Sequence, residues 1–255
     1  MPIVVVTNTK GGVAKTTTTA ETAANLARRG RRVLLLDMDP AGCASWALGC
    51  APAPRQPCLG EAVLGRTPLE DVIRETYLPN LWVAPASREL AKVTDSTPLG
   101  SLTEALDPVR DRYDLILVDS PPTLSPVFVL ALLTADEALF VTSADPHGER
   151  GLAEYTKEWR ALGGKYSSML PNRIGVLLTK WDTRSNVSRE VGRRIRGALG
   201  EAVFQTFIRR DATAERAPDY AKAIADLDPE CRAARDYDAA VDELIRRLHL
   251  RGYEV

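Results

Sequence analysis

Short runs of β-branched and aliphatic residues alternate with longer amphipathic stretches along almost the whole chain. The short runs predict strands at residues 3–7, 32–36, 81–84, 115–118, 138–142 and 174–179. The amphipathic stretches predict helices at residues 16–29, 99–112, 148–162, 187–199 and 229–248. This alternation is typical of a parallel sheet whose strands are joined by crossover helices. The predicted fold class is therefore α/β, a doubly wound, mostly parallel sheet with helices on both faces.

The length and composition of the chain fit one folded domain. The chain has 255 residues, of which 45% are hydrophobic, and a net charge of −1, so it can bury one large core. No repeat or linker marks a boundary, and we expect residues 1–255 to form a single domain. The apolar stretches are shorter than the roughly 18 residues of a membrane helix, and no basic leader precedes the first strand. We therefore expect a cytoplasmic protein.

A glycine-containing turn joins the first predicted strand to the first predicted helix. It reads Lys10-Gly11-Gly12-Val13-Ala14-Lys15-Thr16-Thr17. A strand, such a turn and a helix N-terminus together form the context of a phosphate-binding loop, in which backbone N–H groups and the helix dipole face phosphate oxygens. In this interpretation Lys15 neutralises phosphate charge, Thr16 ligates Mg²⁺, and Thr17 reaches the α-phosphate.

Acidic residues follow two other predicted strands. The segments are Asp37-Met38-Asp39-Pro40 and Asp119-Ser120-Pro121-Pro122. The carboxyl ends of parallel strands meet at one edge of a doubly wound sheet, where ligands bind, so we expect all three carboxylates beside the phosphate loop. Helix capping would explain any one of these aspartates, but it does not explain all three at strand ends.

Together these motifs resemble the ParA/Soj family of partition ATPases, part of the ParA/MinD superfamily of P-loop proteins. The classical loop, G-x-x-x-x-G-K-[ST], is met only at its end, because Thr9 and Ala14 occupy its glycine positions. The family's deviant form, K-G-G-x-x-K-T-T, does match, and it places a second lysine, Lys10, before the glycines. We expect alanine at position 14 to be tolerated only if its φ angle is negative.

The resemblance implies a single P-loop ATPase domain and a role for each motif residue. Lys10 contacts the nucleotide across a sandwich dimer that forms with ATP, and Asp39 activates the attacking water. Asp119 holds Mg²⁺ through water, and Asp37 supports the metal region. The implied catalytic residues are Lys10, Lys15 and Asp39, and the implied metal residues are Thr16, Asp37 and Asp119. The implied nucleotide contacts are Lys10, Gly11, Gly12, Val13, Ala14, Lys15, Thr16, Thr17 and Pro218, and the cofactor is Mg²⁺ with ATP.

The segment after the second predicted strand departs from the family pattern. Where ParA proteins commonly read D-P-Q-G-N, this chain reads Asp39-Pro40-Ala41-Gly42-Cys43 and lacks two amide side chains. The resemblance implies weak turnover without a partner, since the chemistry depends on positioning a water and stabilising charge. The departure predicts slow or differently controlled hydrolysis. A binding module that has lost useful turnover is an alternative.

Two motifs indicate which nucleobase the site binds, adenine or guanine. Thr179-Lys180-Trp181-Asp182 matches the T-K-x-D element with which some related GTPases read guanine. ParA sequences also carry an aspartate at this point, and here residues 182–186 continue in the ParA manner. Family members contact adenine through a segment that ends in A-P, which Ala217-Pro218 matches. Adenine is therefore favoured over guanine.

Basic residues are concentrated between Arg173 and Arg216. Ten basic and five acidic residues give this segment a charge of +5 in a chain of net −1. Such a stretch can pair with DNA phosphates without reading bases. The resemblance implies nonspecific binding of double-stranded DNA by the ATP dimer, through Arg184, Arg209 and Arg210. A solvated helix face at residues 189–196 is the alternative interpretation.

The leading hypothesis is a ParA-type ATPase for plasmid or chromosome segregation. Its ATP dimer would hold DNA at the nucleoid, and a ParB-type centromere-binding protein would stimulate hydrolysis and release. A ParA-like positioning ATPase for a protein cargo shares all of this chemistry. A MinD-like membrane-associated ATPase needs a basic amphipathic C-terminal helix with bulky apolar groups. Residues 244–255 contain no aromatic cluster and include the acidic Glu254, so we expect this segment to pack against the sheet.

Overall fold

The computed structural model describes residues 1–53, 55–249 and 251–254, and its centre is one twisted sheet. Within these residues the sheet has eight strands in the order β3-β4-β2-β5-β1-β6-β7-β8. All neighbours are parallel except the antiparallel pair β3 and β4. The strands are β1 (Ile3–Thr7), β2 (Val33–Asp37), β3 (Arg74–Glu75), β4 (Leu81–Ala84), β5 (Leu115–Asp119), β6 (Glu137–Ser143), β7 (Asn172–Trp181) and β8 (Val203–Arg209).

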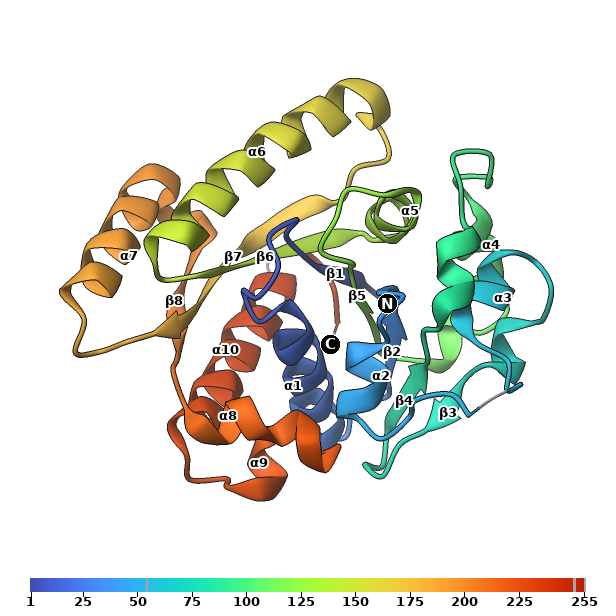
Figure 1. The fold of residues 1–255 in the computed structure, drawn as a ribbon, viewed down its shortest axis with the longest axis horizontal. Helices are drawn as coiled ribbons and strands as arrows, with labels where there is room; N and C mark the ends of the chain where they lie inside the picture. The colour runs from blue at the N-terminus through green and yellow to red at the C-terminus, as the bar shows by residue number, and fades with distance from the viewer. Residues whose placement is uncertain (54, 250, 255) are drawn as a thin grey trace.

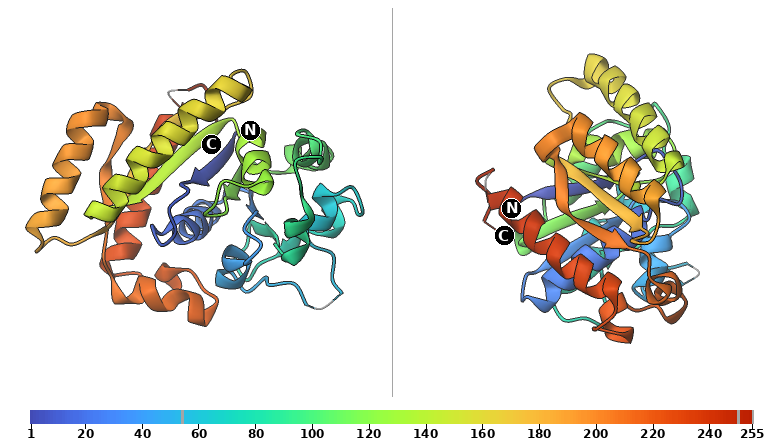
Figure 2. Two further views of the ribbon diagram at one scale, coloured as in Figure 1. Left: turned by 45° about the horizontal axis from the view of Figure 1, so that its top comes forward. Right: turned by 90° about the vertical axis from the view of Figure 1, so that its left-hand side faces the viewer.

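Helices cover both faces of this sheet (Figure 1). They are α1 (Lys15–Arg28), α2 (Cys43–Ala47), α3 (Leu59–Val63), α4 (Ser101–Leu106), α5 (Pro126–Thr134), α6 (Pro146–Tyr166), α7 (Asn186–Leu199), α8 (Ala212–Arg216), α9 (Ile224–Leu227) and α10 (Arg232–His249). Figure 2 separates the layers at one end, with α6 and α7 on one side of β7 and α10 on the other. The predicted fold class is confirmed.

The central strands are apolar throughout because both of their faces are buried. Successive strand side chains point to opposite faces, so Ile3 and Val5 of β1 join the core under α3–α7, whereas Val4 and Val6 join the core under α1 and α10. Parallel pairing aligns the strand ends: Val6 lies opposite Asp119, and Asp37 lies opposite Asp119 on the other side. The register thereby gathers the phosphate loop and the acidic segments at one edge.

The structure differs from the predicted elements in several places, and the short elements β3, α2, α3, α8 and α9 were not predicted. The helix expected at residues 99–112 covers only Ser101–Leu106, because Pro108 lacks the N–H that would continue it. The sequence prediction missed α5, whose apolar residues surround the helix and give no amphipathic period. It also missed β8, which lies at the edge of the sheet within the basic stretch.

The C-terminal helix packs as expected, as far as the structure describes it. Leu244 and Leu248 of α10 are buried in the core shared with α1 and β8. The MinD-like alternative needs this apolar face for lipid, and here the protein core occupies it. Among the described residues, no helix is long and apolar enough to span a bilayer.

Candidate nucleotide and magnesium site

The loop between β1 and α1 is fixed by buried hydrogen bonds from neighbouring strands. The Asn8 side chain donates to the Val141 carbonyl over 2.8 Å and accepts from the Lys10 amide over 2.8 Å. The Thr179 hydroxyl donates to the Val13 carbonyl over 2.8 Å. Strands β6 and β7 therefore hold the loop in shape without a ligand. Such preorganisation is what a phosphate cradle needs.

Ala14 immediately precedes α1 and has φ 68° and ψ 32°, in the left-handed region. The expectation of a negative φ at this position is therefore wrong. A Cβ in the left-handed region costs about 1–2 kcal/mol. The loop thus carries backbone strain at the position where the classical motif has glycine.

Lys15 lies in the cavity wall at the start of α1. Its side chain is buried, and its ammonium donates to the Lys10 carbonyl over 3.2 Å. Burial lowers the pKa of Lys15, while Asp119 and Asp39 act in the opposite direction. A phosphate group would add negative charge beside this ammonium and favour its charged form.

Asp119 at the end of β5 forms the acidic part of the site. Its two carboxylate oxygens accept from the Thr16 hydroxyl over 2.8 Å and from the Thr19 hydroxyl over 2.9 Å. Burial, and then the charge of Asp37, raise the pKa of Asp119 to about 7, against the effect of Thr16, Thr19 and Lys15. A buried carboxylate with a raised pKa beside a threonine hydroxyl fits Mg²⁺, whose charge would stabilise the ionised form.

The donor set also fits the way Mg²⁺ usually binds. The ion keeps several waters and takes one or two carboxylates plus substrate phosphates. Within the part of the chain that the structure describes, no three His, Cys, Asp or Glu side chains group into a complete metal cage. Thr16 and Asp119 would therefore hold Mg²⁺ together with phosphate oxygens and water.

Asp37 ends β2 directly opposite Asp119, at the strand end where it was predicted. Its carboxylate accepts from the Ser45 amide and hydroxyl, both over 2.7 Å, and from the Asp39 amide over 3.2 Å. Burial raises the pKa of Asp37 to about 6. These bonds join its oxygens to the segment between β2 and α2, and its predicted part in the metal region stays a prediction. Asp37 positions Asp39.

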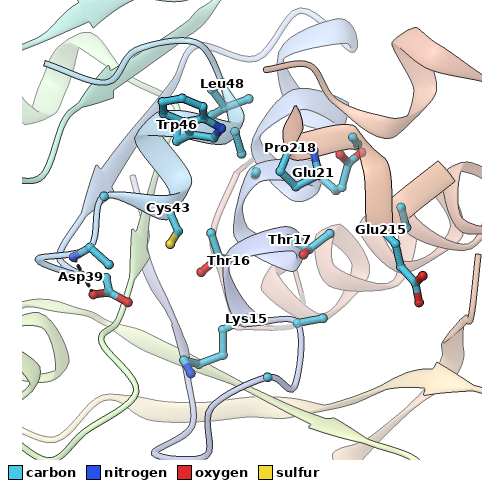
Figure 3. Close-up of a pocket in the computed structure, with 18 of the residues that line it drawn as sticks. Lys15, Thr16, Thr17, Glu21, Asp39, Cys43, Trp46, Leu48, Glu215 and Pro218 are labelled. Carbon is cyan, nitrogen blue, oxygen red and sulfur yellow. Dashed lines mark hydrogen bonds between the residues drawn. The ribbon is translucent and has the colours of Figure 1, made fainter. Parts of the chain in front are cut away.

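Asp39 lines the cavity opposite α1, as predicted for a residue that contacts water. Figure 3 shows Asp39 and Cys43 on one side of the cavity and Thr16 and Thr17 on the other. Asp39 is half-buried, and one of its oxygens accepts from the Ala41 amide over 2.9 Å. The exposed Cys43 thiol stands where the family pattern has an amide.

The cavity has a volume of about 880 Å³ and continues from the phosphate loop to the ends of β7 and β8. Pro218, Ile208 and Lys180 are among its lining residues. Asp182 is not among its lining residues, and its carboxylate accepts from the Arg184 amide over 2.9 Å. The segment predicted to contact adenine is therefore in the wall, whereas the aspartate of the guanine-type motif is not.

Lys10 is exposed, and its stem rests on α6. A Cβ placed on Gly151 would lie 3.0 Å from the Lys10 Cβ and 3.1 Å from its Cγ. Next to it, the Thr9 hydroxyl donates to Glu158 of α6 over 2.7 Å. Sequence reasoning missed these contacts and the role of Thr19, because α6 and the loop are brought together only by the tertiary fold.

The three arginines predicted to bind DNA are in different environments. Arg209 pairs with Asp236 of α10. Its Nε donates to the Asp236 carboxylate over 2.9 Å, and its Nη2 donates to the same carboxylate over 2.7 Å. This pairing raises the pKa of Arg209 and offsets its positive charge with that of Asp236, and its role as a DNA contact stays a prediction. Arg184 and Arg210 are exposed, and no ion pair forms with either within the described residues.

Two of the four arginines of α7 form ion pairs. Arg194 contacts Glu149 over 2.6 Å and Glu190 over 3.3 Å, and Arg193 contacts Glu190 over 2.6 Å. These pairs reduce the net charge of the helix face. These ion pairs agree with the alternative interpretation of residues 189–196 as a solvated face, and the choice between the two stays open.

Comparison with known proteins agrees with this geometry. A family model described as an AAA domain matches residues 1–171. The sporulation initiation inhibitor protein Soj of Bacillus subtilis is 33% identical over 92% of this chain and 94% of its own length. The chain belongs to the ParA/Soj family. Relatives in this family include the chromosome-partitioning ATPase Soj of Thermus thermophilus, 33% identical over 94% of both chains, so the family's members are ATPases.

Solved structures share the ParA/Soj fold seen here. Apo McdA from Cyanothece superposes with a TM-score of 0.84 at 20% identity, covering 96% of this chain and 99% of McdA. Cobyrinic acid a,c-diamide synthase from Mycobacterium smegmatis, with bound ADP and magnesium, has a TM-score of 0.82 at 26% identity. That alignment covers 98% of this chain and 96% of the synthase.

Proposed function

We propose that this ParA/Soj member is an ATP-dependent switch that segregates plasmid or chromosome DNA. The observation that carries the proposal is that Lys15, Thr16 and Asp39 line one cavity that extends to Pro218, with Asp119 behind Thr16 and bonded to it. Lysine, a hydroxyl–carboxylate pair and a second carboxylate are what Mg²⁺-assisted phosphoryl transfer requires. We include residues 1–255 in one ATPase domain, since both cores pack on a single sheet.

Mg²⁺ with ATP is the proposed ligand. The backbone from Lys10 to Thr17 would surround the phosphates, Lys15 would neutralise them, and Thr16 with Asp119 would hold the ion. The ADP and magnesium bound to the related synthase support this choice. When bound, Mg²⁺ would withdraw charge from the phosphate oxygens.

The role in hydrolysis is assigned to Asp39, whose carboxylate would orient the attacking water by accepting a hydrogen bond from it. Asp37 fixes Asp39 through the Asp39 amide. Lys10 is proposed to reach the nucleotide of a second copy in an ATP-dependent homodimer. Turnover is therefore expected to be weak in the monomer and to rise with DNA and a ParB-type partner.

DNA binding is proposed for Arg184 and Arg210, which are exposed and unpaired in the part of the chain that the structure describes. Contacts to phosphates alone give binding that ignores sequence and weakens as salt rises. Such binding would place the ATP dimer at the nucleoid. A ParB-type protein at the centromere would then trigger release.

The test is fluorescence anisotropy of a random-sequence DNA duplex with ADP, ATP, GTP and a slowly hydrolysed ATP analogue, at low and moderate salt. We expect binding only with ATP or its analogue, and weaker binding at the higher salt. Arg210→Ala should reduce it several-fold, whereas Arg193→Ala, which removes a paired arginine of α7, should leave it near wild type. Equal binding with ADP, or dependence on GTP, would contradict the proposal.

A further inference from the structure

Glu21 is a buried acidic residue in the wall of the nucleotide cavity. It lies on α1 four residues after Thr17, and residues at this spacing share one face of a helix. Its side chain is 3% exposed. It lines the cavity beside Pro218, as Figure 3 shows. None of the roles assigned above uses this residue.

Only one oxygen of the Glu21 carboxylate has a partner. Oε1 accepts from the Ile224 amide over 2.8 Å, whereas the buried Oε2 receives no hydrogen bond from the described residues. The nearby donors are already committed. Arg28 pairs with Asp226 over 2.8 Å, and the Tyr77 hydroxyl donates to the same carboxylate.

An unpartnered buried carboxylate oxygen is costly, so it points to a missing donor. Burial raises the pKa of Glu21 to about 7, as expected for a carboxylate without enough donors. Water or a ligand hydroxyl in the cavity could supply the hydrogen bond.

The position of Glu21 along α1 indicates which part of a bound nucleotide lies beside its carboxylate. Four residues of helix span about 6 Å, and helical side chains lean toward the N-terminus. The carboxylate therefore lies just beyond Thr17, the proposed α-phosphate contact, and beside Pro218. In a nucleotide the sugar directly follows the α-phosphate, and the base lies beyond it. Acidic side chains commonly accept hydrogen bonds from ribose hydroxyls in dinucleotide-binding folds.

We propose that Glu21 Oε2 accepts a hydrogen bond from the 2′- or 3′-hydroxyl of the ribose of the bound nucleotide and makes the cavity discriminate against nucleotides that lack this hydroxyl. This inference rests on the proposed nucleotide binding. Glu21 is a specificity residue here, since it contacts neither the phosphates nor the attacking water. Hydrogen bonds to charged groups are worth enough to change affinity by about 10- to 100-fold.

The test is titration calorimetry with Mg²⁺ and ADP, 2′-deoxy-ADP or 3′-deoxy-ADP, which avoids hydrolysis. The wild type should bind at least one deoxy analogue about 10-fold or more weakly than ADP. Glu21→Ala should reduce that ratio to near one, and Glu21→Gln, which keeps an acceptor for Ile224, should reduce it while preserving the fold. Asp226→Asn alters the neighbouring carboxylate outside the cavity wall, so it should keep the wild-type ratio.

The outcomes separate this inference from the proposed function. Tight ADP binding with equal affinity for all three nucleotides overturns the role of Glu21 and leaves nucleotide binding intact. A wild-type preference that survives in Glu21→Ala and Glu21→Gln also overturns it. Absence of binding to any of the three by folded wild-type protein overturns the proposed function itself.

Discussion

Replacing Ala14 by glycine should stabilise the ligand-free protein, because Ala14 has a left-handed backbone conformation with φ 68°. The left-handed region costs an L-residue about 1–2 kcal/mol. Glycine avoids that cost but loses about 0.5–1 kcal/mol more backbone entropy on folding than alanine. The difference predicts a net gain of roughly 0.5–1 kcal/mol for Ala14→Gly.

Two neighbouring glycines provide matched controls with the opposite change. Gly12 has φ 76°, Gly11 has no positive φ, and a Cβ on either would meet no atom within 4 Å. Space is therefore equal at both positions and only the backbone conformation differs. Gly12→Ala should destabilise the protein by roughly 0.5–1 kcal/mol, whereas Gly11→Ala should be neutral or slightly stabilising.

The assay is thermal and urea unfolding of the three variants without nucleotide. For a chain of this size about 1 kcal/mol shifts Tm by roughly 2–4 °C, so the expected order of stability is measurable: Ala14→Gly above wild type, Gly11→Ala at or slightly above it, and Gly12→Ala below it. If Ala14→Gly destabilises the protein, or if the two glycine variants behave alike, the argument from backbone strain is refuted.

Three further predictions concern Glu21, Thr19 and Gly151. The pKa of Glu21 is raised from 4.5 to about 7 in the folded state, so its contribution to stability is greatest below pH 4.5 and is lost as pH rises through 7. Without nucleotide, the stability of Glu21→Gln relative to wild type should therefore rise by about 3 kcal/mol between acid and mildly alkaline pH; a constant difference in unfolding free energy would contradict this. Thr19→Val removes a hydroxyl that donates to Asp119, so isothermal titration of ADP should show a higher Mg²⁺ requirement, and an unchanged requirement would count against the metal assignment. Gly151→Val should displace the Lys10 stem and abolish ATP-dependent dimers in sedimentation while ADP still binds. Gly164 lies on the same helix, and a Cβ there would meet no atom within 4 Å, so Gly164→Val should dimerise normally.

Much of the phosphate end of the site could be predicted from local sequence. A strand, a glycine turn and a helix start are contiguous in the chain, and parallel pairing places Asp119 beside the loop. The structure puts Thr16 within 2.8 Å of that carboxylate. The specific site roles remain proposals, but the placement of these groups follows from the pattern of the strands.

The remaining features depend on contacts between distant segments. From local sequence, Glu21 is a polar residue on an amphipathic helix. In the fold it is buried beside a segment 203 residues later, whose Ile224 amide donates to it. Arg209 reads as a free cation until α10 brings Asp236 against it. The φ angle of Ala14 depends on how the strands hold both ends of the turn. No local periodicity encodes any of these three.

The central claim is that ATP in this cavity controls assembly. Sedimentation velocity should be measured for the Asp39→Ala variant, which is expected to leave ATP intact, with Mg²⁺ and either ADP or ATP. We expect a monomer with ADP and a dimer with ATP, and we expect that adding Lys10→Ala prevents the dimer while nucleotide still binds. The same sedimentation coefficient with both nucleotides, at concentrations where both are shown to bind, would contradict the central claim.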